Sequence, residues 1–167
     1  MIPAHDRDIA AVVLLALEHA GLPFESVTAR IEAELLARSE VESWLSAAAL
    51  AASQDGVVAV LKEVAGTHPL FCDTFAVLEV LLRVREHHRV APERVIRFLL
   101  RRWYDGRIPS DLTPFMDDLY EDGFCAHDYE EVQPELANRA LGRFLTAARG
   151  RSPLARVIAR VAEAGWV

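Results

Sequence analysis

Apolar residues recur at helical spacing along nearly the whole chain. In residues 24–38, for example, Val27, Ile31 and Leu35 fall on one stripe, while Arg30 and Glu34 are spaced for an ion pair one turn apart. This pattern predicts an amphipathic helix with one buried face. Glycine and proline divide the chain into about eight or nine segments of ordinary helix length. The predicted helices cover residues 6–19, 24–38, 39–48, 55–65, 73–84, 92–105, 113–120, 134–148 and 152–165.

Two segments refine the predicted fold. Residues 57–61 would suit a strand by composition, but no second strand-like run exists to pair with them, so we interpret them as helix. Residues 73–84 are apolar on nearly every side, which is typical of a central helix surrounded by others. The sequence therefore predicts an all-α protein. We expect a single compact helical bundle or orthogonal array, with residues 1–167 forming one domain.

Composition excludes several classes of protein. A chain of 167 residues that is 52% hydrophobic, with a net charge of −7, is large enough for a core and too apolar for a disordered chain. The apolar run at residues 9–17 is too short to span a bilayer. Two cysteines, Cys72 and Cys125, are too few for a disulfide scaffold. We expect a cytoplasmic protein with no cofactor, and the negative charge argues against binding to nucleic acid or an anionic membrane.

Charge is strongly segregated along the sequence. Residues 1–80 hold twelve acids and four bases, and residues 83–107 hold eight arginines and three acids. Residues 110–135 then carry nine carboxylates and no Lys or Arg, and residues 139–160 carry six arginines and no acid. Such a dense acidic segment destabilises the compact state unless positive charge lies nearby. That positive charge belongs either to the chain itself or to a partner.

Both explanations remain open at this stage. In the first, the acidic segment docks between the two basic helices of its own chain. In the second, it forms a docking face for a basic protein, with aromatic side chains as anchors among the carboxylates. Glu121 and Asp122 favour the second, since they follow a helix predicted to end at Tyr120, where the helix dipole disfavours anions. The predicted partner-binding residues are Asp117, Asp118, Tyr120, Glu121, Asp122, Phe124, Asp128, Tyr129, Glu130 and Glu131.

The preferred hypothesis is a small acidic interaction module that is not an enzyme. An immunity or antitoxin-type inhibitor is one concrete form, in which the carboxylates would occupy a cationic substrate groove of the partner. A homo-oligomer, in which the acidic segment of one copy meets the basic helices of another, is a further alternative.

A metal- or thiol-dependent enzyme is the first rival hypothesis. Residues 125–128 bring a thiol, an imidazole and a carboxylate together, and Cys72 with His68 is a second thiol–imidazole pair. Asp118 and Asp122 would share one helix face and could bind a divalent ion, but a second ligand-bearing helix is missing. A calcium loop over residues 118–129 fails because Tyr120 and Tyr129 stand where oxygen ligands are needed.

A DNA-binding regulator is the second rival. Helix 92–105 carries Arg94, Arg97, Arg101 and Arg102, which could form a basic patch. The helix offers no Asn, Gln, Ser or Thr to base edges, and the acidic segment that follows it supplies compensating charge. We rank this hypothesis last.

Overall fold

The structure is a computed structural model that describes residues 2–37, 43–51, 53–88, 92–123 and 134–167. Within these ranges it contains nine α-helices and no strand, so the all-α prediction is confirmed. The α-helices are α1 (Ala4–Leu15), α2 (Phe24–Ala37), α3 (Ser43–Leu50), α4 (Gln54–Ala65), α5 (Thr74–His87), α6 (Pro92–Tyr104), α7 (Thr113–Gly123), α8 (Pro134–Ala148) and α9 (Ala155–Glu163). The short elements are the π-helical turn η1 (Ala16–Ala20) and the 3₁₀ turns η2 (Pro69–Cys72) and η3 (Ser110–Leu112).

Local side-chain chemistry explains where several helices begin and end. Ser53 accepts a hydrogen bond from the backbone N–H of Gly56 at 3.2 Å and so caps α4, which makes residues 57–61 helical as predicted. Asp73 caps α5 in the same way, accepting from the N–H of Phe75 at 2.9 Å. Gly21 ends the first helical segment with a φ of 71°, a left-handed conformation that glycine adopts without steric cost.

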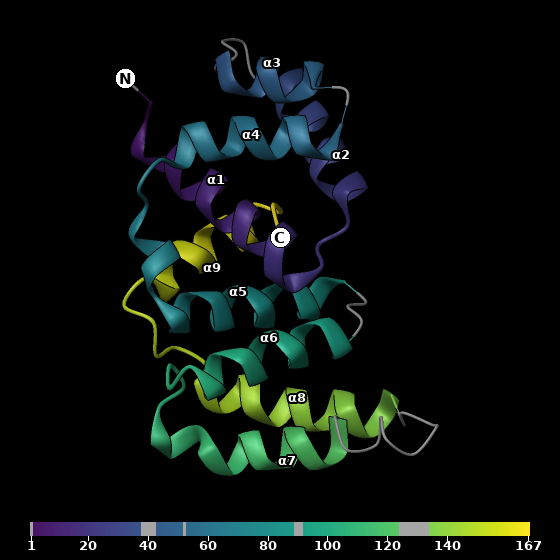
Figure 1. The fold of residues 1–167 in the computed structure, drawn as a ribbon. Helices are drawn as coiled ribbons and strands as arrows, with labels where there is room; N and C mark the ends of the chain where they lie inside the picture. The colour runs from purple at the N-terminus through teal and green to yellow at the C-terminus, as the bar shows by residue number, and fades with distance from the viewer. Residues whose placement is uncertain (1, 38–42, 52, 89–91, 124–133) are drawn as a thin grey trace.

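The helices are stacked in layers along the long dimension of the molecule. Figure 1 shows α3 and α4 toward one end, α7 and α8 at the other, and α1, α9, α5 and α6 between them. Helix α1 packs on α4 and α9, whereas α6 packs on α7 and α8. Helix α5 contacts η1, α8 and α9 and buries most of its residues. The prediction of a central helix at residues 73–84 is thus confirmed.

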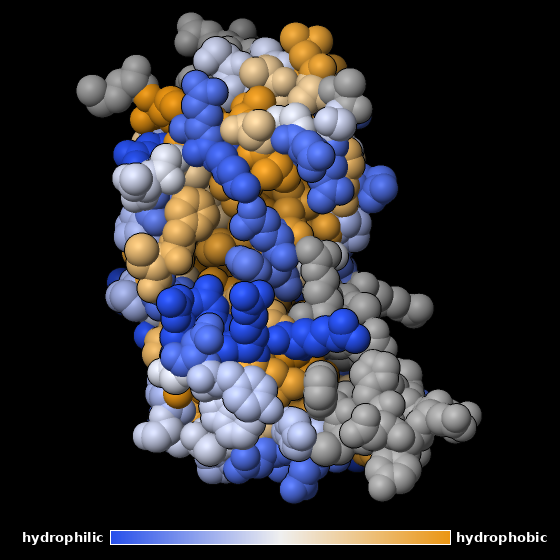
Figure 2. Space-filling view, viewed as in Figure 1, coloured by the Kyte–Doolittle hydropathy of each residue, from blue (hydrophilic) through white to orange (hydrophobic). Residues whose placement is uncertain are grey.

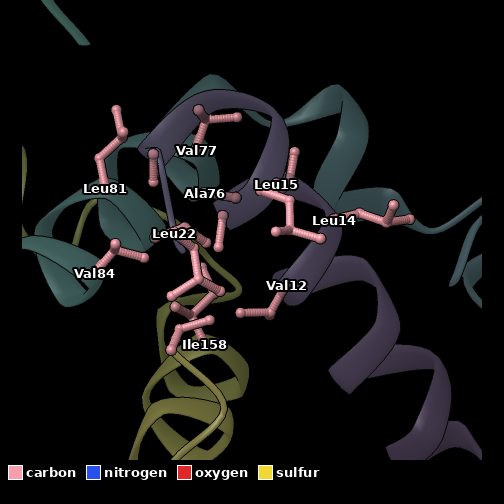
Figure 3. Packing of buried hydrophobic residues seen from close by; sticks show 14 of the residues in the cluster. Val12, Leu14, Leu15, Leu22, Ala76, Val77, Leu81, Val84 and Ile158 are labelled. Atoms are coloured by element: carbon pink, nitrogen blue, oxygen red, sulfur yellow. The ribbon is translucent and has the colours of Figure 1, made fainter. Parts of the chain in front are cut away.

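Buried aliphatic side chains join these layers in one hydrophobic cluster. Figure 3 shows part of it, where residues from α1 and the turn after η1 face α5 and α9. Leu14 of α1 and Leu22 after η1 lie on one side of this region. Val77 and Leu81 of α5 and Ile158 of α9 lie on the other side, and all five side chains are at least nine-tenths buried. Burial of this apolar surface is the main term that holds the array together.

Three predicted boundaries need correction. The first helix changes to a π-helical turn at Ala16 instead of continuing as an α-helix to residue 19. Helix α7 continues to Gly123, so Glu121 and Asp122 lie inside the helix and not beyond its end. The last helix begins at Ala155, because Ser152 Oγ accepts a hydrogen bond from the N–H of Leu154 at 3.0 Å and holds a turn before it. The capping box expected at residues 39–42 lies outside the described residues.

None of the described helices has both the length and the apolar composition needed to cross a bilayer.

Candidate functional site

The predicted partner-binding residues divide into two groups. Asp117, Asp118, Tyr120, Glu121 and Asp122 all lie on α7. The other five lie outside the described residues, together with two members of the proposed thiol site; these are Phe124, Asp128, Tyr129, Glu130, Glu131, Cys125 and His127.

On one face of α7, two carboxylates form ion pairs with the same arginine of α8. Arg143 contacts Asp118 at 3.1 Å and Asp122 at 3.3 Å, so a single guanidinium bridges two carboxylates one helical turn apart. Arg151, just after α8, contacts Asp111 at 2.6 Å. Positive charge of the same chain thus lies beside each of these three carboxylates. Asp122 lies in the last turn of α7, where the helix dipole disfavours an anion, and Arg143 partly compensates that carboxylate within the chain.

A second face of α7 presents two carboxylates to solvent. Asp117 and Glu121 are exposed, and neither has an ion pair or side-chain hydrogen bond within the described part of the chain. They are four residues apart, so their like charges repel one another on the helix surface. Tyr120 is half-buried because its side chain packs against the core. It is therefore less accessible to a partner than the sequence suggested.

The structure weakens the enzyme alternatives that rest on described residues. Arg143 lies where a divalent ion would have to bridge Asp118 and Asp122. No group of three or more His, Cys, Asp or Glu side chains able to hold a metal occurs in the described ranges.

His68 is occupied by structural hydrogen bonds. Its Nδ1 accepts from the N–H of Leu70 at 3.3 Å, because a backbone N–H can only donate. The ring proton of a neutral His68 must then sit on Nε2, which lies 3.0 Å from Asp8 Oδ1. Both ring nitrogens are used, so neither remains to take a proton from the exposed Cys72 thiol.

The arginines of α5 also serve the fold. Arg83 contacts Glu79 and Glu86, each at 3.3 Å. Arg85 donates to the carbonyl oxygen of Asn138 on α8 at 2.7 Å, and partial burial of its guanidinium lowers its pKa.

Two arginines of α6 are different, whereas the side chain of Arg94 lies outside the described part of the structure. Arg97 and Arg101 are exposed, and neither has an ion pair or side-chain hydrogen bond to any residue that the structure describes. The sequence predicted that the acidic segment 110–135 would supply the charge that compensates Arg97 and Arg101. In the structure, the described carboxylates of that segment that form ion pairs contact Arg143 and Arg151 instead. These arginines line a hollow of about 490 Å³ together with His19. Sequence reasoning missed His19, because it lies some eighty residues away and only the fold brings it to α6.

No protein-family model, curated protein or solved structure matches the chain. Functional assignment therefore depends on the chemistry of its residues.

Proposed function

We propose that the protein is a small interaction module that binds a basic protein partner through the exposed face of α7, defined by Asp117 and Glu121, within the acidic segment 110–135. The observation that carries this proposal is the division of the α7 carboxylates. Arg143 forms ion pairs with both Asp118 and Asp122, whereas the neighbouring face carries two charges with no counterpart among the described residues.

Repulsion between the two exposed carboxylates of α7 favours binding of a positively charged partner. Two exposed carboxylates one turn apart destabilise their own helix by a few tenths of a kcal/mol. A basic partner would convert this repulsion into attraction, and complementary charge would accelerate the encounter. Arg143 also fixes the neighbouring face of α7 against α8, which would present the binding face on a rigid helix and reduce the entropy lost on association.

An immunity or antitoxin-type inhibitor acting in the cytoplasm is one form of this function. The exposed carboxylates would then stand in the cationic groove where the partner normally holds an anionic substrate. An adaptor protein would use the same exposed face of α7 and would require the same positive charge on its partner.

The decisive experiment separates the two faces of α7. In the variant D117N/E121Q the exposed face loses its charge, while the Arg143 contacts remain. Wild type and variant would be used to capture proteins from a lysate of the source organism at low salt, with identification by mass spectrometry. The affinity of a recovered basic protein, once purified, should fall about tenfold in the variant, which corresponds to roughly 0.7 kcal/mol for each charge.

The matched control is D118N/D122N, which removes two negative charges from the face that is paired with Arg143. We expect this control to retain most of the affinity. Equal affinity of wild type and D117N/E121Q would refute the proposal, because the exposed face would then contribute nothing. An equal loss in both variants would indicate a response to net charge instead of this face, and recovery of this chain itself would indicate a homo-oligomer.

A further inference from the structure

Two adjoining hollows form a groove along η1: the basic one lies against α6, and the more apolar one lies toward η2 and α5. The basic part is the hollow of about 490 Å³ lined by Arg97, Arg101, Arg102, Arg107 and Asp105, with the rings of His19 and Phe98. Figure 2 shows strongly hydrophilic residues gathered at the level of α6, with hydrophobic surface beside them. The volume lies within the range of about 300–1,000 Å³ that is usual for small-molecule sites.

The basic part holds an excess of positive charge. Four arginines line it against the single carboxylate of Asp105. Arg97, Arg101 and Arg107 form no ion pair or side-chain hydrogen bond with the described residues, in contrast to Arg83, Arg143, Arg149 and Arg151, which all contact carboxylates. Guanidinium groups gathered in a concave surface repel one another. An anionic ligand would relieve that repulsion.

An aromatic stack shapes the middle of the groove. The ring of His19 lies 4.7 Å from that of Phe98, and the guanidinium carbon of Arg102 lies 5.2 Å from the same ring. His19 belongs to the π-helical turn Ala16–Ala20, which ends at Gly21. Single π-helical turns are rare and occur frequently at functional sites. This turn is thus an independent observation that points to the same place.

The apolar part of the groove adjoins the basic part. A second hollow of about 300 Å³ has the nearly fully buried Leu14, Leu15 and Val77 at its floor and the more exposed Phe71 in its wall, and it shares His19 and Arg102 with the first. Glu18 and Lys62, which pair at 3.0 Å, also line it. Phe71 is 37% exposed although it faces an apolar hollow. An apolar group placed here would remove that ring from water, which is favourable.

We propose that this groove binds a small phosphorylated amphiphile. Its phosphate contacts Arg97, Arg101 and Arg107, and its apolar part lies against the exposed ring of Phe71. A phosphate monoester is favoured over a carboxylate because it carries up to two negative charges and three acceptor oxygens, which match several guanidinium groups. A nucleic acid is disfavoured, since α6 carries no Asn, Gln, Ser or Thr and the net charge of the protein is −7.

The test compares two probes on the full chain by isothermal titration calorimetry. Octyl phosphate, below its micellar concentration, carries both features of the ligand, and methyl phosphate carries only the anionic one. Burial of two or more methylene groups predicts that octyl phosphate binds at least ~10-fold tighter. The variant R97Q/R101Q should weaken octyl phosphate at least ~10-fold through loss of charge-assisted hydrogen bonds. F71A should reduce the preference for the octyl chain without changing methyl phosphate binding.

The matched control is R139Q/R156Q, which removes two exposed arginines outside the groove and should bind octyl phosphate like wild type. R107Q alone provides the same test if R97Q/R101Q does not fold, as judged by circular dichroism.

Absence of saturable octyl phosphate binding would overturn the proposal, as would unchanged binding to R97Q/R101Q or, if that variant does not fold, to R107Q. Equal affinity for the two probes would overturn the apolar part, and equal affinity for octanoate would overturn the preference for phosphate. Retardation of duplex DNA that depends on Arg97 would replace the amphiphile with nucleic acid.

Discussion

The buried carboxylate of Glu79 gives the sharpest prediction about stability. Glu79 is 2% exposed on α5, and its two oxygens have different partners. One lies 3.3 Å from the guanidinium of Arg83, and the other accepts a hydrogen bond from the N–H of Gly150 at 2.9 Å. The side chain therefore joins the central helix to the turn after α8. Replacing Arg83 by methionine keeps the aliphatic stem but leaves a buried charge with a single hydrogen bond.

The magnitude follows from the geometry. Removing one partner of a fully buried ion pair costs about 3–5 kcal/mol. Arg83 is 28% exposed, and Glu79 keeps the Gly150 hydrogen bond, so we expect a loss of about 2–3 kcal/mol. With an m-value of about 2 kcal/mol/M, the urea midpoint should fall by about 1–1.5 M. The measurement is equilibrium urea unfolding followed by circular dichroism.

A double-mutant cycle tests the cause. E79M/R83M removes both charges, so it should be more stable than R83M alone, because no unpaired carboxylate remains in the core. The control is R149M, which breaks the Arg149–Glu86 pair between partly exposed side chains and should cost about 0–1 kcal/mol. If R83M unfolds within about 0.5 kcal/mol of wild type, or if the double variant is the less stable one, the buried charge does not control this region.

Three further outcomes are expected. F144A should destabilise the protein by about 3–5 kcal/mol in urea unfolding, because this phenylalanine is fully buried in α8 and its loss leaves a cavity; a cost below about 1 kcal/mol would show that the site collapses. R143Q should cost only about 0.5–1 kcal/mol, since its contacts to Asp118 and Asp122 are partly solvated, and high salt should reduce the difference. Burial lowers the pKa of His88 in the folded protein below its ordinary value of 6.5. As the pH falls through 6.5, His88 therefore binds its proton more readily in the unfolded state than in the folded state. His88 should therefore reduce stability at acidic pH, and H88Q should flatten that pH dependence; an NMR titration that places the His88 pKa at or above 6.5 would contradict this.

Much of the helical architecture could be predicted from local pattern. The stripe Val27–Ile31 is buried as expected, and Arg30 pairs with Glu34 at the predicted spacing. Such features depend on residues three or four positions apart, which the helix itself brings together. Asp118 and Asp122 are also four residues apart, so their position on one helix face could likewise be predicted from the sequence.

Other features required contacts between distant segments. The sequence carried two basic blocks on either side of an acidic one, and nothing local decides which arginine reaches which carboxylate. The packing of α7 on α8 brings Arg143 to Asp118 and Asp122, whereas Arg97 on α6 forms no such pair with a described residue. This choice determines which charges hold the fold and which remain available for a ligand.

The sequence by itself determined the all-α class, the positions of most helices and the segregation of charge, because each arises from residue spacing or composition. Only the tertiary structure decided that Asp118 and Asp122 pair with Arg143 while Asp117 and Glu121 face solvent without a described partner. It alone also brought His19 beside the arginines of α6, through a π-helical turn that periodicity did not reveal. The physical reason is that a helix sets the direction of each side chain, whereas its partner depends on how whole helices pack.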